Sequence, residues 1–318
     1  MKKKVRTNNM RVIFMGTPDF AVGTLEEIIR AGHEVVLVVT QPDKPKGRGN
    51  AMQFPPVKEC ALAHDIEVFQ PKRIRDDANV EYLKKYDADI IIVAAFGQIL
   101  PKSILDMPRY GCVNVHASLL PKYRGAAPIQ WAVINGDAIT GVTTMRMDVG
   151  LDTGDMIAKR EVRIAEDETG GSLFDKLAEV GAKLCVETMD MLEKGTATFT
   201  PQNNEMSTHT SMITKELGNI DWKKPAVELE RLVRGLNPWP SAYTHLNNKT
   251  FKIWKAKVIP EDSEYQPGCI VRADKHDLIV QTGEGQLALL EVQLEGKKRM
   301  EADAFLRGNQ LEEGTFFA

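Results

Sequence analysis

The feature that most constrains the fold is a series of short, almost wholly apolar segments in the first half of the chain. The clearest are residues 11–16 (RVIFMG) and 88–95 (ADIIIVAA), and helix-like spacing of apolar residues follows the first of them over 18–30. Continuous apolar strands that alternate with helices are typical of a parallel sheet covered on both faces. The sequence therefore predicts an α/β fold, with a Rossmann-like, mostly parallel sheet and helices on both faces.

Further strands are expected in the same half, at residues 33–40, 66–69, 111–117, 141–148 and 156–164. The last two are close enough in sequence for antiparallel pairing. A long helix is expected over residues 172–193, where Ser172 and Asp175 have the spacing of a capping box.

The second half of the chain has a different pattern. Apolar periodicity stops over residues 196–211, where small polar residues dominate, and this indicates a linker. A helix is expected at 226–234. It is followed by short strands at 242–246, 250–259, 268–272, 277–282 and 286–293. Strands of this length separated by Gly, Asn and Asp turns favour a small OB-like antiparallel β-barrel. We therefore divide the chain into a disordered tail (1–9), a first domain (10–195), the linker (196–211) and a C-terminal domain (212–318).

Composition narrows the class of protein. At 318 residues, with 43% hydrophobic and 27% charged residues, the chain is long enough for two globular domains. A formal net charge of -3 argues against a protein that coats nucleic acid indiscriminately, so a polyanionic partner must be bound by local patches. No apolar run approaches the ~20 residues needed to span a bilayer, and the basic N-terminus lacks a secretory apolar segment. We expect a cytoplasmic, monomeric protein with no membrane partner.

The cysteines are widely scattered, with no CxxC pair and no Cys/His spacing that suits zinc. They are Cys60, Cys112, Cys185 and Cys269. We therefore expect reduced thiols and no metal.

The turn after the first strand raises the hypothesis of dinucleotide binding. Residues 16–21 (GTPDFA) keep the first Gly of the GxGxxG fingerprint but place Pro18 where the backbone should approach a pyrophosphate. A nicotinamide-dependent oxidoreductase is therefore a weak alternative.

Asn114 and His116 lie one residue apart near the end of an expected parallel strand. Residues i and i+2 of a strand point to the same side, and open α/β sheets bind their ligands at the carboxyl ends of strands. For this pair alone, a buried Asn and His satisfied by backbone groups remains an equal alternative.

The loop over 148–155 (DVGLDTGD) adds a carboxylate. Together, the three residue types supply an oxyanion donor, an acid/base and an orienting charge. No activated nucleophile is evident, since there is no GxSxG and Cys112 is interpreted as out of phase with Asn114.

Two segments in this region closely resemble the folate-dependent formyltransferase family: residues 114–137 (NVHASLLPKYRGAAPIQWAVINGD) and 148–156 (DVGLDTGDM). The resemblance extends over nearly the whole chain. It includes MGTPDF at 15–20, TQPDKPKGRG at 40–49 and GLNPWPSAYT at 235–244. These segments are similar to the branch of the family that acts on charged initiator tRNA.

The resemblance implies an enzyme that moves a formyl group from 10-formyltetrahydrofolate to the amino group of methionine on initiator tRNA. It assigns catalysis to Asn114, His116 and Asp152. The folate contacts that it implies are Ser118, Leu119, Leu120 and Pro121. It also makes residues 10–195 the catalytic domain and 212–318 a tRNA-binding domain.

The loop over residues 41–50 carries three cations, Lys44, Lys46 and Arg48. A loop of this composition is often only mobile surface. The resemblance implies contact with the acceptor end of the tRNA, principally through Arg48. In the C-terminal domain, lysines interleaved with aromatic residues over 249–257 fit either a solvated strand face or a cradle for the acceptor stem.

Three alternatives remain open. A formyltransferase acting on a small amine would share the catalytic trio but would not need the basic loop and a lysine-bearing second domain. A non-catalytic RNA-binding module would leave the trio without a purpose. The nicotinamide oxidoreductase would need the missing glycine fingerprint.

Overall fold

The computed structural model describes residues 9–46 and 51–317. Most of the expected tail over 1–9 therefore lies outside the described residues. The chain folds into two compact units, each discontinuous in sequence. Unit 1 comprises the chain up to Gly125, Ile139–Arg163 and Phe174–His209, and unit 2 comprises Ala126–Ala138, Ile164–Leu173 and the chain from Thr210 onward. The contiguous division made from the sequence, with its linker at 196–211, stays a prediction.

Unit 1 is built on a seven-stranded sheet in the order β10-β9-β7-β6-β1-β2-β5. Its strands are β1 (Arg11–Gly16), β2 (Glu34–Val39), β5 (Val68–Phe69), β6 (Ile90–Ala94), β7 (Cys112–His116), β9 (Ile139–Arg146) and β10 (Met156–Arg163). The strands from β7 to β5 are parallel, whereas β9 runs antiparallel to both β7 and β10. The expected mostly parallel sheet, with an antiparallel pair near residues 141–164, is confirmed.

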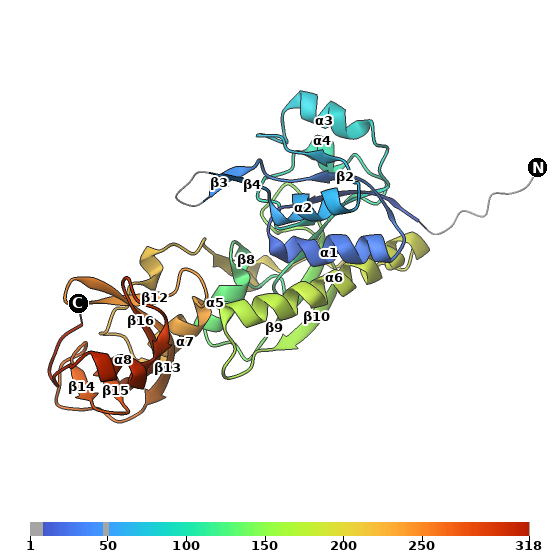
Figure 1. The fold of residues 1–318 in the computed structure, drawn as a ribbon. Coiled ribbons are helices and arrows are strands. Elements are labelled where there is room, and N and C mark those ends of the chain that lie inside the picture. Colours follow the sequence, from blue (N-terminus) through green and yellow to red (C-terminus); the bar gives the residue numbers. More distant parts are fainter. Residues whose placement is uncertain (1–8, 47–50, 318) are drawn as a thin grey trace, which may run out of the picture. The chain divides into compact units, whose positions relative to one another are not determined.

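Helices cover both faces of this sheet (Figure 1). On one face, α1 (Asp19–Arg30) and α6 (Gly170–Lys194) lie side by side, with Phe20 and Phe174 in edge-to-face contact. A side chain at Gly181 of α6 would meet Val115 of β7, so the helix packs closely on the strand. The other face packs an apolar cluster against α3 (Asp77–Lys84) and α4 (Lys102–Leu105). The expected covering on both faces is confirmed.

The N-terminus of α6 differs from the prediction. The amide of Thr169 donates to the Ser172 hydroxyl oxygen at 3.0 Å, and the amide of Ser172 donates to the Thr169 hydroxyl oxygen at 3.0 Å. Since α6 begins at Gly170, Thr169 is the cap. The predicted pair of Ser172 and Asp175 is therefore wrong, because the reciprocal bonds form one turn earlier.

Several shorter elements complete unit 1. A two-stranded hairpin, β3 (Lys44–Lys46) with β4 (Ala51–Gln53), leads into α2 (Pro56–Ala63). The short strand β8 (Arg124–Gly125) and the 3-10 helix η1 (Asn204–Met206) follow later in the chain. The strand β11 (His209–Thr210) has its first residue in unit 1 and its second in unit 2. The sequence did not predict α2 or the hairpin.

Unit 2 contains an antiparallel sheet in the order β12-β13-β16-β15-β14, with β17 paired to β16. Its strands are β12 (Ala242–Leu246), β13 (Lys249–Ile259), β14 (Ile270–Ala273), β15 (Leu278–Gln281), β16 (Gln286–Leu294) and β17 (Met300–Glu301). Its helices are α5 (Pro128–Ile134), η2 (Glu216–Gly218), α7 (Ala226–Gly235) and α8 (Ala302–Gly308). The antiparallel architecture is confirmed. The pairing of the described strands is an open path, so closure into an OB-like barrel stays a prediction.

Within the described residues, no helix combines the length and the apolar composition that crossing a bilayer requires.

Gly16 at the end of β1 provides a test of packing in unit 1. A Cβ there would lie 2.7 Å from the Cβ of Ala21 and 2.9 Å from the carbonyl oxygen of Ala94. Glycine is therefore required at position 16 because a side chain would not fit, and not because it belongs to a dinucleotide-binding fingerprint. We expect Gly16→Ala to destabilise the protein by about 1–3 kcal/mol, measured by urea unfolding.

Gly23→Ala in α1 is the matched control, because a Cβ there meets nothing within 4 Å. It should stabilise the helix by about 0.5–1 kcal/mol, and equal destabilisation by both changes would contradict the steric argument.

Candidate active site

The three candidate catalytic residues lie together in unit 1. Asn114 and His116 lie on one face of β7, and Asp152 lies in the loop between β9 and β10. The Asn114 amide nitrogen is 3.4 Å from Oδ1 of Asp152, and Nδ1 of His116 is 3.7 Å from Oδ2 of the same carboxylate. Asn114 and His116 are buried, and only 13% of the Asp152 side chain is exposed. The structure thus brings together side chains that the sequence separates by 38 positions.

The loop reaches this face by folding back over the sheet. Because β9 is antiparallel to β7, its last residue, Arg146, pairs with Val113 near the start of β7, and the amide of Met147 donates to the carbonyl of Cys112. The chain must then return past Cys112 before Asp152 reaches Asn114 and His116. The parallel-sheet argument therefore predicts where β7 presents its residues, but it does not explain the position of Asp152.

Hydrogen bonding determines which ring nitrogen of His116 faces the carboxylate. Nε2 is 2.8 Å from the carbonyl oxygen of Tyr123. A carbonyl oxygen can only accept, so Nε2 carries a hydrogen and donates it. Nδ1 is the other ring nitrogen, and it lies on the side of Asp152. The 3.7 Å separation is too long for a direct hydrogen bond, so Nδ1 remains available to a reacting group.

The backbone of Asp152 has a left-handed conformation, with φ of 53°. Such a conformation costs about 1–3 kcal/mol at a residue other than glycine and must be held by its surroundings. The amide of Gly125 donates to Oδ2 at 2.8 Å. Nε2 of Gln202 donates to the carbonyl oxygens of Asp152 and Gly154, each at 2.8 Å. The loop that carries Asp152 is therefore fixed through both the side chain and the backbone of that residue.

Gln202 is itself oriented by a buried cation. Its side-chain oxygen accepts a hydrogen bond from Nε of Arg124 at 3.0 Å, and Nη2 of Arg124 donates to Asn204 at 2.9 Å. Arg124 is only 3% exposed. Sequence reasoning missed Gln202, because it lies in the polar segment interpreted as a linker and has no local pattern that marks it. Only the fold shows that this segment contacts the loop that carries Asp152.

The predicted folate-contacting segment follows His116 directly. Ser118 and Leu120 are fully buried, whereas Leu119 and Pro121 are half-buried. Thr143 on β9 binds this segment twice, since its hydroxyl donates to the carbonyl of Ser118 and accepts from the amide of Leu120. The exposed surface of the segment is therefore provided by Leu119 and Pro121, on a backbone that Thr143 fixes.

Of the predicted tRNA-contacting residues, Lys44 is exposed at the start of β3 and Lys46 ends that strand. Arg48 lies outside the described residues. The hairpin is anchored where it leaves the sheet: Asp43 accepts hydrogen bonds from Lys58 at 2.7 Å and from Gln70 at 2.8 Å. These bonds, with the Lys58 bond the larger cause, lower the pKa of Asp43, so the anchoring carboxylate is charged at neutral pH.

The expectation that Cys112 is out of phase with Asn114 is wrong. The two residues are two positions apart on β7 and share a face. The Cys112 thiol nevertheless points into the apolar core, where it donates to the carbonyl of Ile104 at 3.6 Å, and burial raises its pKa to about 12. It is therefore protonated at neutral pH and unsuited to act as a nucleophile.

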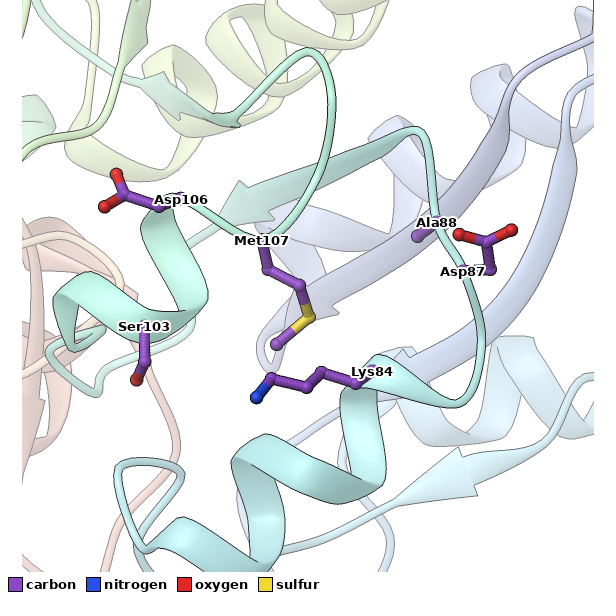
Figure 2. A pocket seen from close by; sticks show the side chains of 6 residues that line it. All are labelled: Lys84, Asp87, Ala88, Ser103, Asp106 and Met107. Carbon is purple, nitrogen blue, oxygen red and sulfur yellow. The ribbon is translucent and has the colours of Figure 1, made fainter.

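A surface hollow of about 370 Å³ lies elsewhere in unit 1 (Figure 2). Its lining residues are Lys84, Asp87, Ala88, Ser103, Asp106 and Met107. Residues 87 and 88 precede β6, and none of the candidate catalytic residues lines it. We assign no role to this hollow.

Comparison with known proteins identifies relatives of both halves of the chain. A family model described as formyl transferase matches residues 10–189, and one described as formyl transferase, C-terminal domain, matches residues 212–310. The chain is 76% identical to the methionyl-tRNA formyltransferase of Agathobacter rectalis over 97% of this chain and 99% of that protein. It is 59% identical to the methionyl-tRNA formyltransferase of Lachnospira eligens over 96% of this chain and 99% of that protein.

Solved structures share the fold at much lower identity. A sugar 3N-formyl transferase, WlaRD, in the presence of dTDP and 5-N-formyl-THF, has a TM-score of 0.65 at 20% identity and covers 91% of this chain and 99% of its own. HypX from Aquifex aeolicus in complex with tetrahydrofolic acid has a TM-score of 0.63 at 19% identity, covering 98% of this chain and 51% of its own. At these identities the likeness shows the fold alone.

The Gln202 contacts generate a prediction about the stability of the loop that carries Asp152. Gln202→Ala removes the donor to two carbonyls and the acceptor of Arg124, and leaving buried polar groups unsatisfied costs about 1–3 kcal/mol. We expect a lower urea midpoint and faster amide exchange over residues 152–155. Asn203→Ala changes the adjacent, exposed amide, which only caps η1, and should have a smaller effect. Equal exchange rates in the two variants would show that Gln202 does not hold the loop.

Proposed function

The chain belongs to the formyl transferase family, and we propose that it formylates the α-amino group of methionine on initiator methionyl-tRNA. The formyl donor is 10-formyltetrahydrofolate, and the product, N-formylmethionyl-tRNA, initiates translation. The observation that carries this function is the 76% identity to a methionyl-tRNA formyltransferase over 97% of the chain, with both family domains matched. No metal is required for the reaction.

The proposed mechanism is direct attack of the amine on the formyl carbon. An α-amino group titrates close to neutral pH, so its uncharged form is available without covalent help from the protein. The attack produces a tetrahedral intermediate with a negative oxygen, and this charge is what the protein must stabilise. The buried, protonated thiol of Cys112 is consistent with a mechanism that needs no protein nucleophile.

We assign the stabilising roles to the catalytic trio. The Asn114 amide donates a hydrogen bond to the developing oxyanion, since its 3.4 Å approach to Asp152 is long enough to be exchanged for substrate. With Nε2 engaged by Tyr123, protonated His116 donates through Nδ1. Asp152 lies beside this imidazole and accepts the proton that leaves the attacking amine, directly or through water. When the intermediate collapses, the bond between the formyl carbon and the folate nitrogen breaks, and that nitrogen takes up the proton as tetrahydrofolate leaves.

The folate is proposed to lie against residues 118–121. Leu119 and Pro121 provide apolar contact with the ligand, and the buried Ser118 and Leu120 hold the segment in place. The Ser118 hydroxyl supports this positioning role, because it already donates to the carbonyl of Lys122 at 2.6 Å.

The acceptor end of the tRNA is proposed to contact the β3–β4 hairpin through Arg48, with Lys44 and Lys46 as secondary phosphate contacts. The hairpin is anchored by Asp43, Lys58 and Gln70, which favours a positioned element over a loose surface loop. Unit 2 is proposed to bind the acceptor stem. A small-amine substrate is disfavoured, because it would leave the hairpin and unit 2 without a role.

We further propose that the protein acts as a monomer in the cytoplasm. The three candidate catalytic residues come from one unit of a single chain, so the site needs no residue from a second copy.

The role of the trio is tested by Asn114→Ala and by Asp152→Asn, which keeps the shape of the side chain but removes its charge. We expect each to lower kcat by about 10²-fold or more with charged tRNA and formyl donor saturating, because an oxyanion donor or its supporting charge is lost. Asp106→Asn, at the hollow of Figure 2, is the control and should keep normal turnover. Near-normal kcat in either trio variant would refute the assignment.

The role of the hairpin is tested by Lys44→Ala. Loss of one phosphate contact should raise KM for methionyl-tRNA, leave KM for the formyl donor unchanged and reduce the salt slope of tRNA binding by about 1. Lys102→Ala removes an exposed lysine of α4 and provides the control. The hairpin role is wrong if the two variants have the same KM and salt slope.

A further inference from the structure

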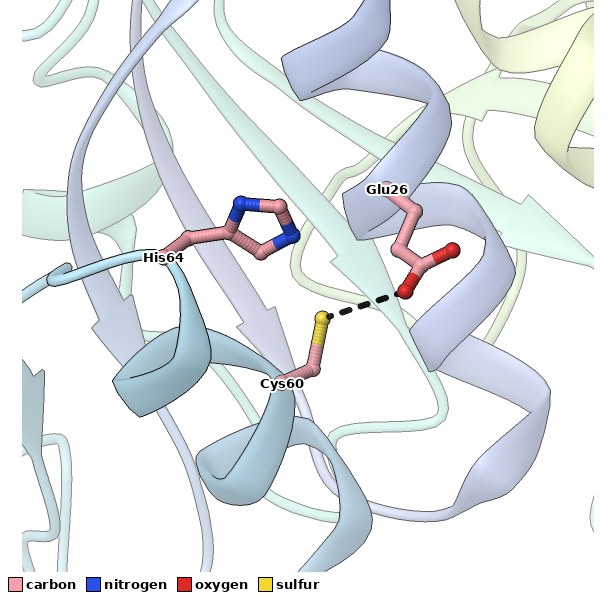
Figure 3. Close-up of side chains that lie close together, drawn as sticks. All are labelled: Glu26, Cys60 and His64. Atoms are coloured by element: carbon pink, nitrogen blue, oxygen red, sulfur yellow. Dashed lines mark hydrogen bonds between the residues drawn. The ribbon is translucent and has the colours of Figure 1, made fainter.

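Three side chains of types that can bind a metal ion lie together on the surface of unit 1, outside the candidate catalytic trio. They are Glu26 on α1, Cys60 on α2 and His64, which caps the C-terminus of α2. One ligand atom from each residue lies within 4.8 Å of the other two. Figure 3 shows the Cys60 thiol and the Glu26 carboxylate directed at each other, with the His64 ring beside them.

Secondary structure produces this arrangement. Cys60 and His64 are four residues apart at the end of one helix, a spacing that places side chains on the same face. Helices α1 and α2 are neighbours, and the Cys60 thiol donates to Oε1 of Glu26 at 3.9 Å. The expectation of no metal rested on the absence of a CxxC pair and of a Cys/His spacing that suits zinc, and α2 was not among the predicted helices. The Cys–His pair becomes visible only when that helix is placed.

We propose that Glu26, Cys60 and His64 bind a borderline-soft divalent cation of the zinc class at the junction of α1 and α2. The combination of one thiolate, one imidazole and one carboxylate suits Zn²⁺ better than Mg²⁺ or Ca²⁺, which prefer oxygen ligands. Four-coordinate zinc is held at about 2.0–2.3 Å from each ligand atom, so the ligand atoms of such a site lie about 3–4 Å apart. The present separations come close to that range.

The side-chain movement needed to bring the three ligand atoms onto an ion is small and local. Glu26 and His64 are exposed, so their side chains can rotate onto an ion without disturbing the core. Metal binding releases the Cys60 thiol proton to solvent, and the Glu26 oxygen that accepted the thiol hydrogen bond becomes free to act as a ligand. The fourth position faces solvent and is taken by water, as in open three-ligand sites.

The site has a structural role rather than a catalytic one. Its ligands come from two helices, so a bound ion joins α1 to α2. Helix α2 also carries Lys58, which anchors the β3–β4 hairpin through Asp43. A metal bound only by the folded state stabilises unit 1 by mass action. This inference does not rest on the proposed function, since formyl transfer without added metal can be measured separately.

The test uses the untagged, full-length protein and Co²⁺ as a spectroscopic substitute for Zn²⁺. We expect a cobalt–thiolate charge-transfer band that saturates at one ion per chain and is abolished by Zn²⁺ in competition. Zn²⁺ should also raise the melting temperature. Cys60→Ser should abolish the band, whereas Glu26→Gln and His64→Gln should each weaken binding by about tenfold or more.

Cys269→Ser is the matched control, because Cys269 is also a partly buried thiol but is not part of this cluster. Its band and affinity should equal those of the unchanged protein. Circular dichroism without metal establishes that each variant is folded. Absence of a thiolate band, its persistence in Cys60→Ser, or affinity unaffected by both Glu26→Gln and His64→Gln would overturn the proposal.

Discussion

The interaction on which the rest of the site depends is the attachment of the Asp152 loop to the segments on either side of it. The loop leaves β9 beside the start of β7 and must return over the sheet to reach Asn114 and His116. Two bonds from Gln202 and one from the Gly125 amide hold it there in a left-handed conformation. Without these bonds, the conformation of Asp152 would relax, and the carboxylate would no longer be held beside the imidazole.

Much of the first unit could be predicted because its signals are local. The strand at residues 11–16 has the predicted bounds, and strand periodicity correctly placed Asn114 and His116 on one face. The same rule, applied correctly, would also have placed Cys112 on that face. The strength of these predictions comes from the period of two, which depends only on neighbouring residues. Asp152 was identified from the family resemblance, because periodicity alone could not show that its loop lies beside β7.

The remaining features depend on contacts distant in sequence. Gln202 lies in a polar segment without periodicity, and its importance comes from three partners on other segments. The helix α2 was missed because it is short, begins with prolines and has a weakly apolar face. Its absence from the predicted elements also concealed the proximity of Cys60 and His64. In each case the information lies in tertiary packing rather than in the local pattern.

The composition of the site indicates how stability and chemistry are balanced in this unit. Asn114, His116 and Arg124 are polar groups buried at 9%, 6% and 3% exposure, where apolar side chains would avoid the desolvation cost. Each instead has a specific partner: Asp152 for Asn114, the Tyr123 carbonyl for His116, and Gln202 for Arg124. The bonds of His116 and Arg124 are short, at 2.8 Å and 3.0 Å, whereas the contacts of Asp152 with Asn114 and His116 are long, at 3.4 Å and 3.7 Å. The supporting groups are therefore satisfied within the protein, and the groups assigned to the reaction keep hydrogen-bonding capacity for substrate. A mechanism that relies on donors and charge, rather than on a nucleophile, requires this distribution, because a donor fully satisfied by the protein cannot stabilise an oxyanion.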